Sequence, residues 1–408
     1  FVGGSQISSI DFALELSRRG HDVVVAARGG PLAARLASGG VENVPLPPRR
    51  QRLKRLSAID RVIAGFGPDL VHATEVRAIL DLCLVTPRRR TPFLGSIFST
   101  RVPWYLPERV PLTVAMPQLY EFTKTWRQSQ LELIEAPMRW PDREDSNSER
   151  LNKAIDAFDG YDHLIVLVSR LVEPFKREGI LRTIAAVRSL SDRGFRLVIV
   201  GDGSARGLYE EAAEHANEAT GKRIVSFTGE LVDPGPAVEA ADVVVGSGTS
   251  AIHAAGGEKP TVVVGRDGFS EVVNDATLDD LIHRGFYGVG RTGIHDLSEQ
   301  IVEALSQGDG PDLRVVASRI RNRYEVQHVT TRLETAMERA ATVPPPEIPE
   351  VLRAAGRFVH YRLRRDVYRF HAKRSGLVAE ESDNYVFGSL RRLAVPPRSR
   401  WTGRSTQV

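Results

Sequence analysis

Two cations stand in the sequence where they could hold a diphosphate group. Arg170 comes directly after Ser169, at the end of the apolar run 163–169, and Lys176 follows six residues later. Arginine can bind two phosphate oxygens at once through its planar guanidinium group, and lysine acts as a compact point charge. Because most Lys and Arg side chains are simply solvated at the protein surface, this pair predicts an anion site only in combination with its neighbours.

Three glycine-containing segments could bring backbone N–H groups close to such an anion. They are the pair Gly3-Gly4, the turn Gly201-Asp202-Gly203 and the run Gly246-Ser247-Gly248-Thr249-Ser250. Glycine permits close backbone approach, and the free N–H groups at the start of a helix attract phosphate. Alone, the first segment fits a plain turn better than a site, the second fits both equally well, and the third is the most site-like of the three. The third lacks the Gly-Lys-Ser/Thr ending of a P-loop, which disfavours an ATPase.

Apolar runs predict the strands that position these segments. Most are continuous Val/Ile/Leu runs, typical of parallel strands covered by helices on both faces. The runs are 22–27, 69–73, 92–97, 112–116, 131–136, 163–169, 195–200, 224–229, 242–246 and 261–265. Amphipathic helices are predicted between them, for example from Gly4 to about Gly20 and over 178–192. This alternation predicts a doubly wound α/β fold.

The strands fall into two groups, which predict two Rossmann-like domains facing a cleft. We assign residues 1–145 to the first domain and 146–310 to the second, with a polar boundary stretch at 140–152. Residues 311–342 would form C-terminal helices that could cross back, and residues 343–408 a proline-containing linker and a helical basic tail. Because the sequence opens with Phe1 and lacks an initiator Met, we expect the first strand of the first domain to precede it.

Composition limits the class of protein. The chain has 408 residues, of which 42% are hydrophobic and 26% charged, as in ordinary globular proteins. No apolar stretch reaches the eighteen residues of a membrane span, and no signal peptide or lipidation signal is expected. The single cysteine, Cys83, excludes a disulfide framework and a cysteine metal site, and it favours a cytoplasmic setting.

The last part of the chain is strongly basic. Residues 351–408 contain 13 Lys or Arg and 4 Asp or Glu, so they carry a net charge of +9. This charge predicts an acidic partner, which could be an anionic membrane surface, nucleic acid or another protein. Because no recognised nucleic-acid-binding module is present, we expect no nucleic acid. A basic helix with interspersed aromatic residues could lie on the inner face of a membrane, although a solvated or protein-packed helix fits equally well.

The glycine turns, the cations and the strand ends described above, taken in their order along the chain, resemble the retaining glycosyltransferases of family 4, which have the GT-B fold. The resemblance covers about residues 1–340. It rests on Gly3-Gly4, Arg19-Gly20-His21-Asp22-Val23, Pro68-Asp69-Leu70-Val71-His72, Arg170-Leu171, Lys176, Gly201-Asp202-Gly203, Phe227-Thr228-Gly229 and Pro260-Thr261-Val262-Val263.

The resemblance implies a hexosyltransferase-type enzyme that moves a sugar from a nucleoside diphosphate sugar to a hydroxyl acceptor with retention. The first domain would bind the acceptor and the second the donor. Arg170 and Lys176 would be catalytic, because they neutralise the leaving diphosphate. No cofactor or metal is expected, since no Asp-x-Asp motif is present. The donor-binding residues would be Gly3, Gly4, Ser169, Gly201, Asp202, Gly203, Gly229, Gly246, Ser247, Gly248, Thr249 and Ser250.

The chain also departs from the family pattern. The paired Glu motif of the family, two Glu residues separated by seven others, is absent from this chain. Val245 stands in the first position and His253 in the second. His253, Glu258 or Glu271 would then hold the donor instead. The family histidine near the acceptor is missing too, which leaves His72 and Trp104 as candidates on the acceptor side. Two alternatives stay open, namely a non-hydrolysing nucleotide-sugar epimerase-like enzyme and a non-catalytic GT-B scaffold.

Overall fold

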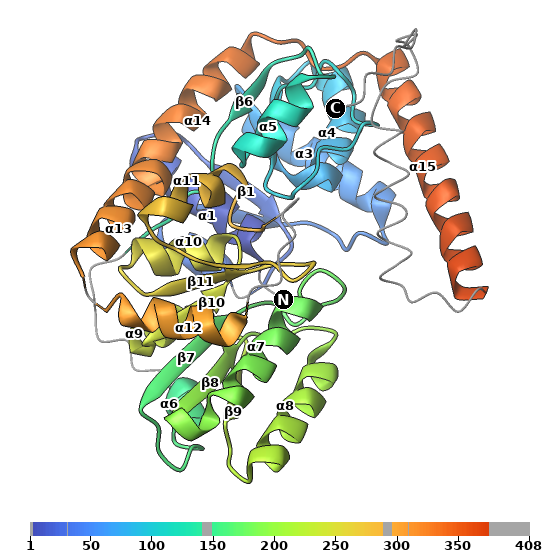
Figure 1. Cartoon of the computed structure of the whole chain (residues 1–408). Helices are drawn as coiled ribbons and strands as arrows, with labels where there is room; N and C mark the ends of the chain where they lie inside the picture. Colours follow the sequence, from blue (N-terminus) through green and yellow to red (C-terminus); the bar gives the residue numbers. More distant parts are fainter. Residues whose placement is uncertain (1–2, 31, 141–148, 289–295, 309, 375–408) are drawn as a thin grey trace, which may run out of the picture.

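The computed structural model describes residues 3–30, 32–140, 149–288, 296–308 and 310–374, with side chains as far as Asp366. Two α/β domains lie one above the other in Figure 1, joined along one side by the orange helices α13 and α14. The predicted fold class, two doubly wound domains with C-terminal helices, is confirmed.

The second domain contains one six-stranded sheet in the order β12-β11-β10-β7-β8-β9. Its strands are β7 (His163–Val168), β8 (Phe195–Val200), β9 (Val225–Gly229), β10 (Val243–Gly246), β11 (Thr261–Val264) and β12 (Ser270–Val272). All neighbours are parallel except β12, which runs antiparallel to β11. The chain order reverses between β7 and β10, so this is the switch point at which open α/β sheets bind ligands.

Helices cover both faces of this sheet. Apolar side chains of α7 (Arg177–Ser189), α8 (Arg206–Thr220) and α12 (Leu297–Ser306) pack on one face. Those of α6 (Glu149–Ile155) and α9 (Gly235–Ala240) pack on the other, beside α10 (Thr249–Gly256). Every residue of β8 is buried, which explains why its sequence is a continuous apolar run.

The first domain has two sheets, each built from parallel strands. One pairs β1 (Val24–Ala27) with β2 (Glu42–Pro45), and the other has the order β3-β4-β5-β6. Its strands are β3 (Val71–Thr74), β4 (Phe93–Ile97), β5 (Leu112–Val114) and β6 (Leu131–Leu133). The domain's helices are α1 (Gly4–Arg18), α2 (Ala33–Ser38), α3 (Arg52–Phe66), α4 (Glu75–Arg89) and α5 (Pro117–Lys124).

Every predicted strand appears, but β2 and β12 were not predicted. Both are short, and neither is a continuous apolar run: β2 reads Glu-Asn-Val-Pro and β12 reads Ser-Glu-Val. A strand of three or four mixed residues gives no periodicity signal that separates it from a loop.

The two C-terminal helices that follow the second domain contact both domains. α13 (Pro311–Tyr324) packs on α10 and on α11 (Asp275–His283), whereas α14 (Val326–Ala341) packs on α1 and β4. At the break between them, the Met138 N–H donates to the Tyr324 carbonyl (2.7 Å), and the Val326 N–H donates to the Met138 carbonyl (2.8 Å). The two segments that cross from one domain to the other, one at Met138 and one at Tyr324–Val326, therefore lie side by side.

A buried carboxylate ties these crossings together. Glu135, fully buried after β6, forms ion pairs with Arg323 at 2.6 Å and with Arg332 at 2.7 Å. Because the arginines come from α13 and α14, one side chain links both helices to the first crossing.

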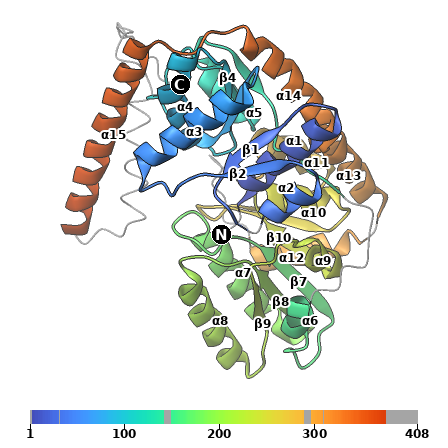
Figure 2. The ribbon, with the colours of Figure 1, turned by 180° about the vertical axis from the view of Figure 1, so that it is seen from behind.

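The basic tail begins as the helix α15 (Ile348–Arg374), which lies beside α4 at the edge of the first domain (Figure 2). Its Val351 and Ala354 are buried there. Further along, the Phe358 and Tyr361 rings contact Tyr105, at centroid distances of 5.2 and 5.3 Å. No helix in the described ranges has the length and apolarity to cross a membrane. Of the predicted tail, residues 375–408 lie outside the described part.

Candidate functional site

The two loops at the switch point meet through a lysine. The Lys176 ammonium, after β7, donates a 2.6 Å hydrogen bond to the Ser247 hydroxyl, after β10. It also lies over the rings of Phe175 and Tyr287, at 5.3 and 5.6 Å. Burial, together with the charge of Arg170, lowers the Lys176 pKa to about 8. A cation held at reduced pKa between two strand ends is suited to an incoming anion.

Glycine is required where the loops after β7 and β8 touch. Gly201 has φ +143°, and a Cβ there would overlap the carbonyl oxygen of Ser169. A Cβ on Gly203 would overlap the carbonyl oxygen of Leu171 in the same way. The backbones pair directly, because the Leu171 N–H donates to the Asp202 carbonyl at 3.0 Å. The turn predicted from Gly-Asp-Gly therefore supports the loop that carries Arg170.

The loop after β10 is equally close-packed. Gly248 has φ +62°, and a Cβ there would overlap the phenol of Tyr287. The Ser250 hydroxyl donates to the Ser247 carbonyl at 3.1 Å and lies 3.3 Å from its N–H. Gly246 leaves room for this hydroxyl. The loop thus turns directly into the N-terminus of α10, which begins at Thr249.

The first domain contributes the glycine pair at the start of α1. A Cβ on Gly3 would lie 3.7 Å from the Arg170 guanidinium, and one on Gly4 would lie 2.9 Å from the Thr249 hydroxyl. The N-termini of α1 and α10 therefore approach each other across the domain interface. The Gly3 N–H donates to the Gln6 side chain at 2.8 Å, but the N–H groups of the first turn of each helix have no partner inside their own helix. Both helices therefore present the positive end of a dipole to the region around Arg170.

Two residues of this site were not predicted. Tyr287 covers Lys176 and Gly248, and it also packs against the core of the first domain. Glu75 begins α4 with φ +69°, which is strained for a side chain of its size. Burial raises the Glu75 pKa, whereas hydrogen bonds from Ser99 and the Phe98 backbone, and to a smaller extent the charge of Arg170 across the interface, lower it. The only sequence signal for Tyr287 is its position between Gly285 and Gly288.

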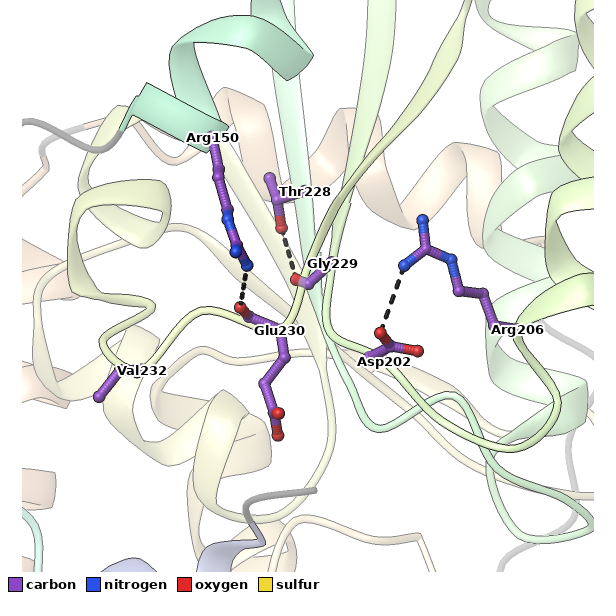
Figure 3. A pocket seen from close by; sticks show the side chains of 7 residues that line it. All are labelled: Arg150, Asp202, Arg206, Thr228, Gly229, Glu230 and Val232. Carbon is purple, nitrogen blue, oxygen red and sulfur yellow. Dashed lines mark hydrogen bonds and ion pairs between the residues drawn. The ribbon is translucent and has the colours of Figure 1, made fainter. Parts of the chain in front are cut away.

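A cavity of about 540 Å³ lies next to the Gly201–Gly203 turn (Figure 3). The Asp202 carboxylate accepts from the Gly203 N–H at 2.7 Å and pairs with Arg206 at 3.3 Å. Val232, 55% exposed, adds an apolar surface at the opposite side. The lining residues are Arg150, Asp202, Arg206, Thr228, Gly229, Glu230 and Val232.

Two predicted donor residues show no contact with Lys176 or Ser247. The His253 ring stacks on Trp140 at 6.1 Å, and the Trp140 indole N–H donates to the His253 carbonyl at 2.9 Å. Burial lowers the His253 pKa, so this histidine has the environment of a packed, neutral ring. Glu271 lies on β12, three strands from β7, or about 14 Å at the usual strand spacing. The structure joins neither residue to the Lys176–Ser247 contact.

The two residues predicted on the acceptor side also have structural partners. The His72 ring lies 2.7 Å from the Ser96 hydroxyl and meets Phe12 edge-on at 6.1 Å. Burial lowers its pKa to about 4, so it is neutral at physiological pH. Trp104 lies next to Tyr105, in the loop on which α15 packs.

Within the described ranges, no three His, Cys, Asp or Glu side chains lie close enough together to hold a metal ion.

Comparisons with known proteins agree with this arrangement. The family "Glycosyl transferase 4-like domain" matches residues 3–132, and the family "Glycosyl transferases group 1" matches residues 162–307. No curated protein sequence is significantly similar to the chain.

Solved structures share the fold. A glycosyltransferase from Rickettsia africae superposes with a TM-score of 0.65 at 15% identity, covering 83% of this chain and 96% of that one. Anabaena HepE in complex with UDP-glucose gives a TM-score of 0.62 at 16% identity, covering 83% of this chain and 97% of that one. The lipopolysaccharide outer core galactosyltransferase WaaB gives a TM-score of 0.53 at 16% identity, covering 83% of this chain and 96% of that one. With one family match on each domain and the same two-domain architecture, the chain belongs to the family 4 type glycosyltransferases with the GT-B fold.

Proposed function

We propose that this glycosyltransferase takes its sugar from a nucleoside diphosphate sugar and transfers it, with retention, to a hydroxyl group of the acceptor. The observation that carries this proposal is the convergence of Arg170, Lys176 and the N-termini of α1 and α10 at the switch point. Four sources of positive potential around one place suit a diphosphate better than a neutral ligand.

In the transfer, the bond between the anomeric carbon and the diphosphate breaks, and the acceptor oxygen bonds to the same face of that carbon. The hydroxyl proton leaves with the diphosphate. Negative charge develops on the leaving oxygen, so Arg170 and Lys176 stabilise the transition state more than the ground state. Because these side chains and the two helix ends supply the neutralising charge, we propose that no metal is needed.

We place the nucleoside in the cavity beside Asp202. This cavity borders the same turn that supports the Arg170 loop, so a ligand could extend from one to the other. Val232 offers an apolar surface for a base, and the Arg150, Asp202 and Arg206 side chains offer polar groups at the rim.

Calorimetry with UDP and GDP tests the donor site. We expect one of them to bind the wild type, and Lys176→Met to weaken that binding at least tenfold, because one charge-assisted contact is lost. Lys153→Met, an exposed lysine of α6, is the matched control and should bind like the wild type. If neither nucleotide binds, the non-catalytic scaffold is the better description. If product analysis shows that the donor sugar is epimerised without an acceptor present, the epimerase-like enzyme is the better description.

We also propose that α15 is the part that contacts an anionic membrane. Four large apolar side chains are exposed on it: Ile348 (58%), Leu352 (66%), Val359 (55%) and Leu363 (62%). Their spacing of four, seven and four residues puts them on one side of a helix. The exposed Arg353, Arg357 and Arg364 border this stripe. An apolar stripe beside arginines fits a helix that lies in the headgroup region of anionic lipid.

Vesicle sedimentation tests this face. We expect binding to vesicles of phosphatidylglycerol and phosphatidylcholine that weakens with salt, and loss of binding in the double variant Leu352→Glu/Leu363→Glu. Val315→Glu, which changes a similarly exposed residue on α13, is the control. Equal binding of the double variant and the control would refute the assignment.

A further inference from the structure

Tyr287 lies where the domain interface meets the loop that carries Lys176. It belongs to the second domain, four residues after the end of α11, and its half-buried ring packs against the core of the first domain. The ring meets Phe175 edge-on at a centroid distance of 5.7 Å, and its centroid lies 5.6 Å from the Lys176 ammonium. One aromatic side chain therefore contacts both the first domain and the loop after β7.

The phenol end of this side chain reaches the start of α10. A Cβ added to Gly248 would overlap the Tyr287 hydroxyl oxygen and the ring carbon that bears it, so these atoms lie directly against the Gly248 backbone. Gly248 is the N-cap of α10, and its neighbour Ser247 accepts the hydrogen bond from Lys176 at 2.6 Å. The hydroxyl group therefore lies beside the cation and the helix end that we assign to the diphosphate.

This hydroxyl group has no hydrogen-bond partner in the part of the chain that the structure describes. Packed tyrosines usually have one: Tyr209, fully buried on α8, donates to the Val172 carbonyl at 3.2 Å. Burial raises the pKa of the Tyr287 phenol more than the charge of Arg170 lowers it, so the group keeps its proton at physiological pH and can donate a hydrogen bond. The partner that is missing is then an acceptor atom that arrives with a ligand.

A phosphate oxygen is the acceptor that fits this place best. Lys176 and the N-terminus of α10 attract negative charge, and a charged oxygen accepts a stronger hydrogen bond than a sugar hydroxyl does. The charge of Arg170 already contributes to the lowered pKa of Lys176, so a further cation here would add repulsion. A phenol adds a contact to the anion without adding charge.

We propose that Tyr287 is a further catalytic residue, which donates its phenol O–H to an oxygen of the donor's diphosphate beside Lys176. This assignment rests on the proposed function and adds a neutral hydrogen-bond donor to its two cations. When the bond between the anomeric carbon and the diphosphate breaks, its electron pair goes to the leaving oxygen, and the hydrogen bond strengthens as that charge develops. Tyr287 keeps its proton throughout.

Calorimetry with UDP, GDP and inorganic pyrophosphate tests this contact in Tyr287→Phe, which loses the hydroxyl group and keeps the ring. We expect pyrophosphate, and the nucleotide that binds the wild type, to bind the variant at least about tenfold more weakly, because a hydrogen bond to a charged group is lost. The same nucleoside without phosphates should bind both proteins equally. Tyr161→Phe, which changes an exposed tyrosine of the second domain, is the matched control and should bind like the wild type.

Equal diphosphate affinities of Tyr287→Phe and the wild type would overturn the proposal, and so would an equal loss of affinity for the nucleoside. Tyr287→Leu removes the ring as well, and tighter diphosphate binding by this variant would show that the ring fills the place of the ligand. Thermal melts of all variants establish that they are folded. If the wild type binds pyrophosphate but neither nucleotide, the nucleotide donor is wrong, whereas a tenfold loss in Tyr287→Phe still supports the hydroxyl contact. A wild type that binds none of the three overturns both.

Discussion

The lowered pKa of Lys176 makes donor binding depend on pH in a range where an ordinary lysine would not. In the free protein this pKa is about 8, compared with roughly 10.4 for an unperturbed lysine. A bound diphosphate favours the charged ammonium and raises the pKa again. Because binding then requires a proton, affinity is constant well below pH 8 and falls as the pH rises through 8.

The size of the effect follows from the protonated fraction. At a pKa of 8, about 90% of Lys176 is charged at pH 7 and about 10% at pH 9. The dissociation constant of the nucleotide should therefore rise about tenfold over this interval, or by about 1.4 kcal/mol.

Calorimetric titration of the bound nucleotide at pH 7, 8 and 9 measures this change. Lys176→Met has no group that titrates at this position, so it should bind weakly with a nearly flat profile. Any titration of the nucleotide itself is common to both proteins and cancels in the ratio. If the wild-type and Lys176→Met affinities keep a constant ratio from pH 7 to 9, the proposed contact between Lys176 and the diphosphate is wrong.

Three further changes should have separable effects. Gly248→Ala places a Cβ against Tyr287 at φ +62°, so nucleotide binding should fall at least about tenfold, whereas Gly207→Ala, with open space around it, should bind normally in the same titration. Glu135→Gln leaves Arg323 and Arg332 without their carboxylate and should lower the free energy of unfolding by about 3 kcal/mol in urea; a change below 1 kcal/mol would argue against a structural link at the crossing. Glu75→Gly relieves the positive φ but removes the hydrogen bonds from Ser99 and Phe98, so the free energy of unfolding should stay within about 1 kcal/mol of the wild type while turnover slows; unchanged turnover would remove Glu75 from the site.

The sequence predicted those parts of the fold that depend on long apolar runs. β7, β8 and β10 are such runs, and the glycine turns after them could be assigned because few other residues fit such turns. The contact between Lys176 and Ser247 is different. It joins residues 71 positions apart and exists because β7 and β10 are neighbours, which only the strand order reveals.

His253 shows what the sequence leaves out. Its place in the family pattern predicts a contact with the donor, and the structure adds that its ring packs on Trp140, which lies in the segment that crosses between the domains.

The central claim is the place of the donor, and a crystal structure with bound UDP or GDP tests it most directly. We predict diphosphate oxygens within hydrogen-bonding distance of Arg170 and Lys176, at the N-termini of α1 and α10, with the nucleoside in the cavity beside Asp202 and Val232. A nucleotide bound in the first domain, or with its diphosphate away from Lys176, would contradict this placement.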